Sequence, residues 1–183
     1  MMTALAAPEV GFGIDWQEVA RALPVDFDVF YRSEYAGALQ FAYVLTGRLP
    51  IAEEITQDAF LSAYGAWGRV GEQPDPGAWV RRVIANASTS WWRRRSTELR
   101  LLARLHGEPV VDPELRPHDE DVLDAVRRLP RRQRQVIALT LLEDRSIAET
   151  AEILGCGEET VRTHLRRGRR ALAEMLGLTE DDA

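Results

Sequence analysis

Apolar residues recur every three to four positions in several stretches of this chain, which is the spacing of one face of an α-helix. From Asp26 onward, for example, Phe27, Phe30 and Leu45 fall on one side of a helix that Gly47 and Pro50 should end. No stretch shows convincing strand alternation, so the pattern predicts an all-α fold. The main helices expected in this way cover about residues 26–46, 51–67, 78–95, 119–129, 131–143 and 146–173.

The last stretch, residues 146–173, has the pattern of a helix, a tight turn and a second helix. Ser146 is a good N-cap, and Glu149 is placed three residues later as its capping-box partner. Gly155 should end the first helix, because glycine readily adopts the left-handed conformation found at helix C-termini. A short Gly-Cys-Gly turn then leads into the second helix.

The second helix of this pair combines an apolar inner face with an arginine-rich outer face. Its inner positions follow one another at spacings of four, three and four: Val161, Leu165, Gly168 and Leu172. Residues 160–173 contain no acid, and five arginines point away from the inner face. An ordinary helical hairpin with a solvated face usually mixes charges of both signs. The pattern therefore favours a helix that lies in a DNA groove.

The chain divides into two helical groups on either side of a proline-containing stretch. Residues 105–118 contain three prolines and no helical period, which is typical of a linker. We expect two small helical domains on a flexible tether. The expected limits are a partly disordered N-terminal extension (1–24), a first domain (25–104), the linker (105–118), a helix-turn-helix domain (119–177) and an acidic tail (178–183).

The net charge of −6 by itself argues against DNA binding, but the charges are unevenly distributed along the chain. Residues 77–106 have a balance of +6 and residues 127–173 a balance of +5, whereas residues 1–76, 107–126 and 174–183 are acidic. The local field decides where a polyanion binds. Two separate basic segments therefore suggest two separate contacts with nucleic acid.

The first basic segment ends in NASTSWWRRRS, residues 86–96. Aromatic rings can stack on exposed bases while guanidinium groups hold the backbone, so this pattern suits a nucleic-acid strand with unpaired bases. Trp79 is more easily explained as core, and the residues alone do not decide whether Trp91 and Trp92 are buried or exposed. The candidates for strand contact are Arg81, Arg82, Asn86, Ser90, Trp91, Trp92, Arg93, Arg94 and Arg95.

Taken together, these motifs resemble a bacterial sigma-70-type RNA polymerase sigma factor of the extracytoplasmic-function (ECF) group. IAEEITQDAFLSAYGAW (51–67) is similar to the family's polymerase-binding helix, and AWVRRVIANASTSWWRRR (78–95) to its −10 element helix. Residues 129–172 look like its −35 element domain, and TSWWRRR resembles the actinobacterial sigma-E-type subfamily. Two such signatures in the right order are far more specific than one helix-turn-helix.

The resemblance implies a promoter-recognition protein with no chemistry of its own. Core RNA polymerase would be bound by Glu53, Glu54, Gln57 and Asp58. The loop expected at residues 68–77, together with Asn86, would capture a flipped base of the melted non-template strand. The duplex −35 element would be read through Thr160, Arg162, Thr163, His164, Arg166, Arg167 and Arg170.

Three positions depart from the family's pattern. Gly157 stands where a serine N-cap is frequent, so the cap of the recognition helix passes to Glu158 or is lost. Gly168 replaces a usual alanine and should cost the helix roughly 1 kcal/mol. Ser90 occupies a position where aspartate or asparagine is common, which weakens the case for a base contact there.

Other functions fit the sequence less well. A helix-turn-helix repressor or activator would explain residues 146–173, but a protein that binds only duplex DNA has no use for the Trp-Trp-Arg segment. An enzyme is disfavoured because His106, His118 and His164 are scattered, so no catalytic residues, cofactor or metal site are expected. The single Cys156 excludes an internal disulfide. With no signal or membrane segment in the sequence, we expect a cytoplasmic protein without membrane contact. Whether an anti-sigma factor binds it is left open.

Overall fold

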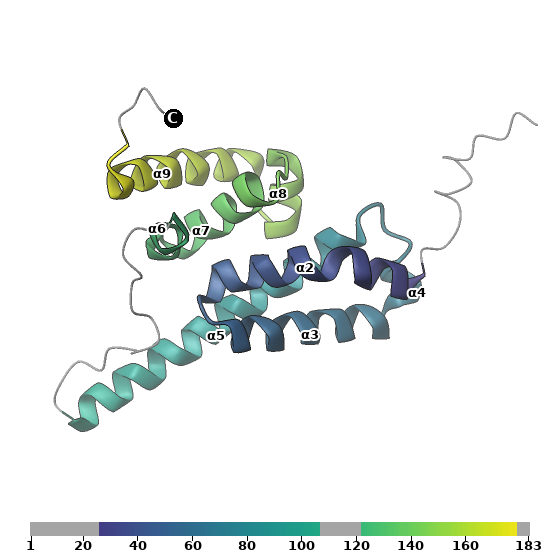
Figure 1. The fold of residues 1–183 in the computed structure, drawn as a ribbon, viewed down its shortest axis with the longest axis horizontal. Coiled ribbons are helices and arrows are strands. Elements are labelled where there is room, and N and C mark those ends of the chain that lie inside the picture. Colours follow the sequence, from purple (N-terminus) through teal and green to yellow (C-terminus); the bar gives the residue numbers. More distant parts are fainter. Residues whose placement is uncertain (1–25, 107–121, 179–183) are drawn as a thin grey trace, which may run out of the picture.

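The computed structural model describes residues 26–106 and 122–178, and all regular structure in these residues is helical (Figure 1). The all-α class predicted from the sequence, with a helix-turn-helix in the C-terminal group, is therefore confirmed. The first group contains α2 (Phe27–Thr46), α3 (Leu49–Gly65), α4 (Trp67–Val70) and α5 (Pro76–His106). The second contains α6 (Val122–Arg128), α7 (Arg131–Ile137), the π-helical turn η2 (Ala138–Leu142), α8 (Ile147–Leu154) and α9 (Glu158–Leu176).

The boundaries of α2 follow from its capping residues. Asp26 caps the start, where its carboxylate accepts a hydrogen bond from the backbone N–H of Asp28 at 3.1 Å. Gly47 ends the helix in the left-handed conformation, with φ of 73°, as the sequence predicted. Pro50 does not lie between helices but in the first turn of α3, where its missing N–H costs nothing.

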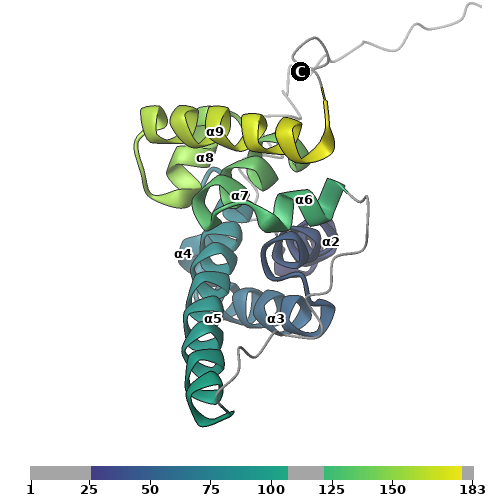
Figure 2. The ribbon, with the colours of Figure 1, turned by 90° about the vertical axis from the view of Figure 1, so that its left-hand side faces the viewer.

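Helix α5 is longer than the hydrophobic pattern predicted. It continues past Arg95 to His106, because residues 96–106 contain no glycine or proline and are rich in leucine and arginine. Figures 1 and 2 show its C-terminal end projecting beyond the other helices. The preceding stretch, residues 68–77, was expected to be a loop throughout, but its beginning belongs to the single turn α4.

Each group of helices has buried apolar contacts of its own. In the first, an aromatic cluster joins α2 to α3, with Phe30 and Phe60 5.7 Å apart between ring centroids. In the second, Val161 of α9 is completely buried, and Gly168 allows α9 to approach α7 closely. A Cβ added at Gly168 would lie 2.8 Å from Cγ1 of Ile137, which gives this glycine a packing role that the sequence did not reveal.

The two helical groups also pack against each other, which the expectation of two tethered domains did not include. Helix α5 contacts α8, and α2 contacts α6, α7 and η2 (Figure 2). The buried apolar residues of both groups form a single continuous cluster. Outside the described residues lie 1–25, 107–121 and 179–183. These ranges include the expected N-terminal extension, nearly all of the expected linker and nearly all of the expected acidic tail.

Candidate nucleic-acid interface

The helix-turn-helix is built as the sequence predicted. The hydroxyl of Ser146 accepts from the N–H of Glu149 at 3.2 Å, and the carboxylate of Glu149 accepts from the N–H of Ser146 at 2.8 Å. Gly155 ends α8 with φ of 62°. Helix α9 begins at Glu158 after Gly157, and no side chain caps it, so the serine-type cap is lost. These features fix the position of α9 relative to α8.

The outer face of α9 presents a row of exposed arginines. Arg162 is partly neutralised by Glu158, at 2.6 Å, and Arg170 lies 3.6 Å from Glu174. Arg166 and Arg167 are exposed and make no ion pair within the described part of the chain. Like Arg169, which is also exposed and without an ion pair in the described residues, these two need not give up a protein partner to bind an external anion.

The remaining residues predicted on this helix are less uniform. Thr160 is exposed, whereas Thr163 and His164 are half-buried. Burial, with smaller contributions from Arg167 and Arg132, lowers the pKa of His164 below its ordinary value. His164 is therefore a neutral imidazole at neutral pH and adds no positive charge to the face.

The outer face of α3 carries the predicted acidic contact surface. Glu53, Glu54, Gln57 and Asp58 are all exposed, while Ala52, Ile55 and Ala59 on the other side are buried. An open hollow of about 500 Å³ lies beside this face, between α2 and α3. Sequence reasoning overlooked it, although exposed Leu61 and Tyr64 are spaced four and seven residues after Gln57, on the polar side of the helix.

The residues predicted to contact single-stranded DNA do not share one environment on α5. Exposed positions are Asn86, Arg93 and Arg94, and half-buried ones are Ser90, Trp91 and Arg95. Three others, Arg81, Arg82 and Trp92, bond to groups in the rest of the protein. The predicted surface is thus only partly accessible in this structure.

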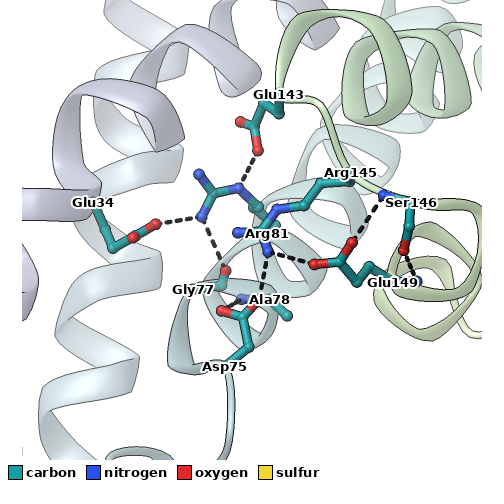
Figure 3. Close-up of polar contacts among 9 residues, drawn as sticks. All are labelled: Glu34, Asp75, Gly77, Ala78, Arg81, Glu143, Arg145, Ser146 and Glu149. Atoms are coloured by element: carbon teal, nitrogen blue, oxygen red, sulfur yellow. Dashed lines mark hydrogen bonds and ion pairs between the residues drawn. The ribbon is translucent and has the colours of Figure 1, made fainter. Parts of the chain in front are cut away.

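Arg81 is the most enclosed of these residues, and its side chain is only 7% exposed. It donates to Glu34 of α2 at 2.6 Å, to the carbonyl of Gly77 at 3.3 Å, and to Glu143, which follows η2 in the second group (Figure 3). Burial raises the pKa of Glu143 above its ordinary value, although the positive charge of Arg81 opposes this. In this arrangement Arg81 cannot reach DNA.

Arg82 and Trp92 are also occupied by contacts with other helices. Arg82 donates to the backbone carbonyls of Glu152 and Ile153, in the last turn of α8. The indole N–H of Trp92 donates to the carbonyl of Leu45 at 2.9 Å, and the guanidinium of Arg134 lies 5.7 Å from its ring centroid. Arg134 itself donates to the same carbonyl at 2.9 Å.

A second set of polar residues was not predicted at all. Arg145 pairs with Asp75 at 2.5 Å and with Glu149 at 3.2 Å, so it ties the start of α8 to the loop before α5 (Figure 3). Glu34, Asp75 and the neighbouring pair Glu143 and Arg145 come from three separate segments of the sequence. No local pattern could have indicated that these four side chains meet.

Comparison with known proteins identifies the family to which these surfaces belong. Residues 30–98 match the family described as Sigma-70 region 2, and residues 119–172 match Sigma-70, region 4. The chain is 31% identical to the RNA polymerase sigma-E factor of Streptomyces coelicolor over 160 residues, which are 87% of this chain and 90% of that protein. The chain belongs to the sigma-70 family. As a sigma factor it is also 29% identical to the ECF RNA polymerase sigma factor SigM of Mycobacterium tuberculosis, over 93% of this chain and 91% of that one.

Solved structures of sigma factors share the fold. RpoE of Bartonella quintana, in complex with the anti-sigma factor NepR, has a TM-score of 0.71 with 23% identity, and the match covers 85% of this chain and 99% of that one. CnrH, in complex with the cytosolic domain of CnrY, has a TM-score of 0.59 with 22% identity, over 82% and 87% of the two chains. The order of helices in this sigma factor is therefore that of its structural relatives.

Within residues 26–106 and 122–178, no three His, Cys, Asp or Glu side chains come together as metal ligands. None of the helices in those ranges combines the length and apolar composition needed to cross a bilayer.

Proposed function

We propose that this sigma factor directs core RNA polymerase to promoters through three separate surfaces, on α3, α5 and α9. The observation that supports it most is the presence of region 2 and region 4 in one chain, each with an exposed surface of the kind its role requires. The domain limits and the residue assignments below are part of the proposal. The protein would act in the cytoplasm, where core polymerase is found.

The polymerase-binding surface is the acidic face of α3. Glu53, Glu54, Gln57 and Asp58 point away from the core, and a face with this charge suits a basic partner. The neighbouring exposed side chains of Leu61 and Tyr64 add apolar area beside the charges. A polar rim beside a small apolar hollow is typical of protein–protein interfaces.

The −10 surface is on α5. Asn86, Arg93 and Arg94 are exposed, and Trp91 with Ser90 is half-buried among them. A ring and guanidinium groups on one helix can stack on the bases of an unpaired strand and hold its backbone. Arg81, Arg82 and Trp92 join this surface only if their present partners move away.

The −35 surface is the outer face of α9. Arg166 and Arg167 are the principal contacts, because they are exposed and have no acidic partner in the described residues. Thr160, Arg162, Thr163, His164 and Arg170 complete it. A bidentate arginine–guanine contact gives about 1–3 kcal/mol of discrimination. Replacing Arg166 by alanine should therefore reduce affinity for a −35 duplex by roughly tenfold or more.

The test is transcription in vitro with core polymerase, followed by sequencing of the RNA 5′ ends. With fragmented genomic DNA as template, the sigma factor should produce transcripts whose start sites share two upstream sequence elements. Core polymerase alone is the control. Two charge-reversal variants separate the surfaces: Glu54→Arg should abolish binding to core, whereas Arg166→Glu should leave core binding intact and abolish initiation. If the wild-type chain neither binds core nor yields defined starts, the proposal is wrong.

Binding of an anti-sigma factor is a further part of the proposal. Two solved relatives were captured with a partner, NepR in one case and the cytosolic domain of CnrY in the other. Their sequence identity to this chain is low, but they are a precedent for such a partner in proteins of this fold. Capture of a partner that competes with core polymerase would test it.

A further inference from the structure

We propose that the free sigma factor is held closed by an ionic clasp, formed by Glu34, Asp75, Arg81, Glu143 and Arg145, and that binding to core polymerase opens it. The clasp joins region 2 to region 4 and removes Arg81 from the −10 surface, and a neighbouring contact with region 4 also engages Arg82. This inference rests on the proposed function for its consequences, but the closed arrangement itself is a property of the free chain. Figure 3 shows the residues concerned.

The first arm of the clasp is centred on Arg81. Its guanidinium bonds to Glu34 of region 2 and to Glu143 of region 4, and the exposed fractions of the three side chains are 7%, 28% and 11%. A guanidinium presents several donors in a fixed planar arrangement, so one side chain can bond to two carboxylates at once. Arg81 therefore joins the two regions through a pair of largely desolvated charges.

The second arm is centred on Arg145. It bonds to Asp75, just before α5, and to Glu149, in the first turn of α8. Glu149 is also the capping-box partner of Ser146, and Asp75 accepts from the N–H of Ala78 at 2.9 Å at the start of α5. The second arm thus connects the N-terminal ends of α5 and α8, which are both rigid elements.

A third contact places α5 against the opposite end of α8. Arg82 donates to the carbonyls of Glu152 and Ile153, which lie in the last turn of that helix. Carbonyls at a helix C-terminus carry partial negative charge and have no partner within the helix. Region 4 is therefore seated on α5 at both ends of α8, by Arg145 at one end and by Arg82 at the other.

The clasp is suited to opening because its central charges are incompletely compensated. Oε1 of Glu143 is buried and has no hydrogen-bond partner among the described residues. Burying charges has a desolvation cost that an ion pair only roughly offsets. The ionic part of the closed state is therefore specific in geometry but modest in free energy, and a partner with differential affinity for the open state can shift the equilibrium.

The same arginines serve the closed and the open states. Arg81 and Arg82 belong to the basic segment that the sequence predicts to contact the melted strand, and both are engaged by region 4 here. The −10 surface is consequently incomplete in the free protein. Separation of the regions would release both guanidinium groups at the moment when core polymerase is bound.

The experiment measures the distance between the two regions in the full-length protein. Nitroxide labels at Gln40→Cys in α2 and Met175→Cys in α9, both exposed sites, are introduced with Cys156→Ser. The clasp variant is Glu143→Gln, which removes the charge and keeps the shape. The matched control is Asp144→Asn, the adjacent exposed carboxylate, which makes no ion pair in the described structure. Its φ of 51° is a conformation that asparagine tolerates.

The expected result is a short, narrow distance distribution for the free wild type and for Asp144→Asn. Glu143→Gln should raise the ratio of open to closed molecules at least about tenfold, which corresponds to about 1.4 kcal/mol. Asp75→Asn, on the other arm, should act in the same direction, and circular dichroism should show that every variant keeps its helices. Adding core polymerase to the wild type should give the long distance.

Two outcomes overturn the proposal: a wild-type protein that is already open when free, or clasp variants whose distances match those of Asp144→Asn. Neither depends on promoter recognition, since the labels report on the free chain. If transcription fails while the distances respond as expected, it is the proposed function that is wrong. If transcription succeeds and the distances do not respond, the clasp is wrong.

Discussion

At the scale of single residues, Gly168 shows how packing overrides helix propensity. The sequence suggested that glycine in the middle of the recognition helix is a cost. The structure shows that a Cβ there would lie 2.8 Å from Cγ1 and 3.1 Å from Cδ1 of Ile137. The glycine therefore allows α9 to lie close against α7, and its low propensity is offset by that contact.

Gly168→Ala should destabilise the protein in spite of alanine's higher helix propensity. Overpacking costs about 1–3 kcal/mol, against a propensity gain of about 1 kcal/mol, so we expect a lower melting temperature. Gly65→Ala is the control, because an added Cβ meets nothing within 4 Å there. A melting temperature that rises in both variants would show that α7 and α9 adjust without cost.

The lowered pKa of His164 predicts how the free energy of unfolding depends on pH. Its pKa is lowered in the folded protein, first by burial and then by Arg167 and Arg132, so the unfolded chain binds this proton more tightly than the folded one. Above the unfolded pKa of about 6.5 both states are neutral and His164 has no effect. As the pH falls below that value, the unfolded chain is protonated first, so the free energy of unfolding decreases until the folded pKa is passed.

Urea denaturation at about pH 7.5 and about pH 5.5 tests this, because the unfolded pKa lies between them. The wild type should lose more stability than His164→Gln over this interval, and the difference between the two proteins isolates His164 from the other histidines. An identical loss in both would show that His164 titrates alike in the folded and unfolded states.

At the scale of elements, the helix termini were predictable and the helix lengths less so. Asp26, Gly47, Ser146 and Gly155 all occupy the terminal positions expected of them, because capping is a local interaction between neighbouring residues. The end of α5 was placed eleven residues too early, at Arg95 instead of His106. Beyond Arg95 the helix leaves the core, so the apolar period that marks a packed helix weakens while helix propensity continues it.

The capping box at the start of α8 carries a prediction for this element. Ser146→Ala removes the side-chain oxygen that accepts from the N–H of Glu149 and should cost about 1 kcal/mol. Ser146→Asn retains a capping oxygen and should cost less. Comparing the two by urea denaturation checks the prediction. Equal stability of Ser146→Ala and the wild type would mean that packing alone fixes the start of α8.

At the scale of the whole molecule, the sequence identified the family and predicted three contact surfaces, but it did not predict the closed arrangement. Periodicity identifies which face of a helix is buried, and it did so for α2 and α9. It carries no information on which buried faces meet across a linker. The contacts of Arg81 with Glu34 and Glu143 span 47 and 62 residues, so only the folded chain could reveal them.

The closed arrangement predicts that the free protein discriminates between two forms of DNA. The outer face of α9 stays exposed, with Arg166 and Arg167 unpaired in the described structure, so a −35 duplex should bind at low salt despite the net charge of −6. A single strand carrying the −10 element should bind weakly, because Arg81, Arg82 and Trp92 are engaged elsewhere. Fluorescence anisotropy with the two DNAs, before and after adding core polymerase, measures both.

The effect of salt separates the two surfaces further. Each phosphate contact contributes a slope of roughly one in the dependence of log affinity on log salt, so Arg167→Ala should reduce the duplex slope by about one and leave strand binding unchanged. Glu143→Gln should affect the other surface. It should strengthen binding of the single strand by the free protein and leave the salt dependence of duplex binding unchanged. A free wild-type protein that binds both DNAs equally well would contradict the masking of α5. Loss of both duplex binding and strand binding in Arg167→Ala would contradict the assignment of separate surfaces to α5 and α9.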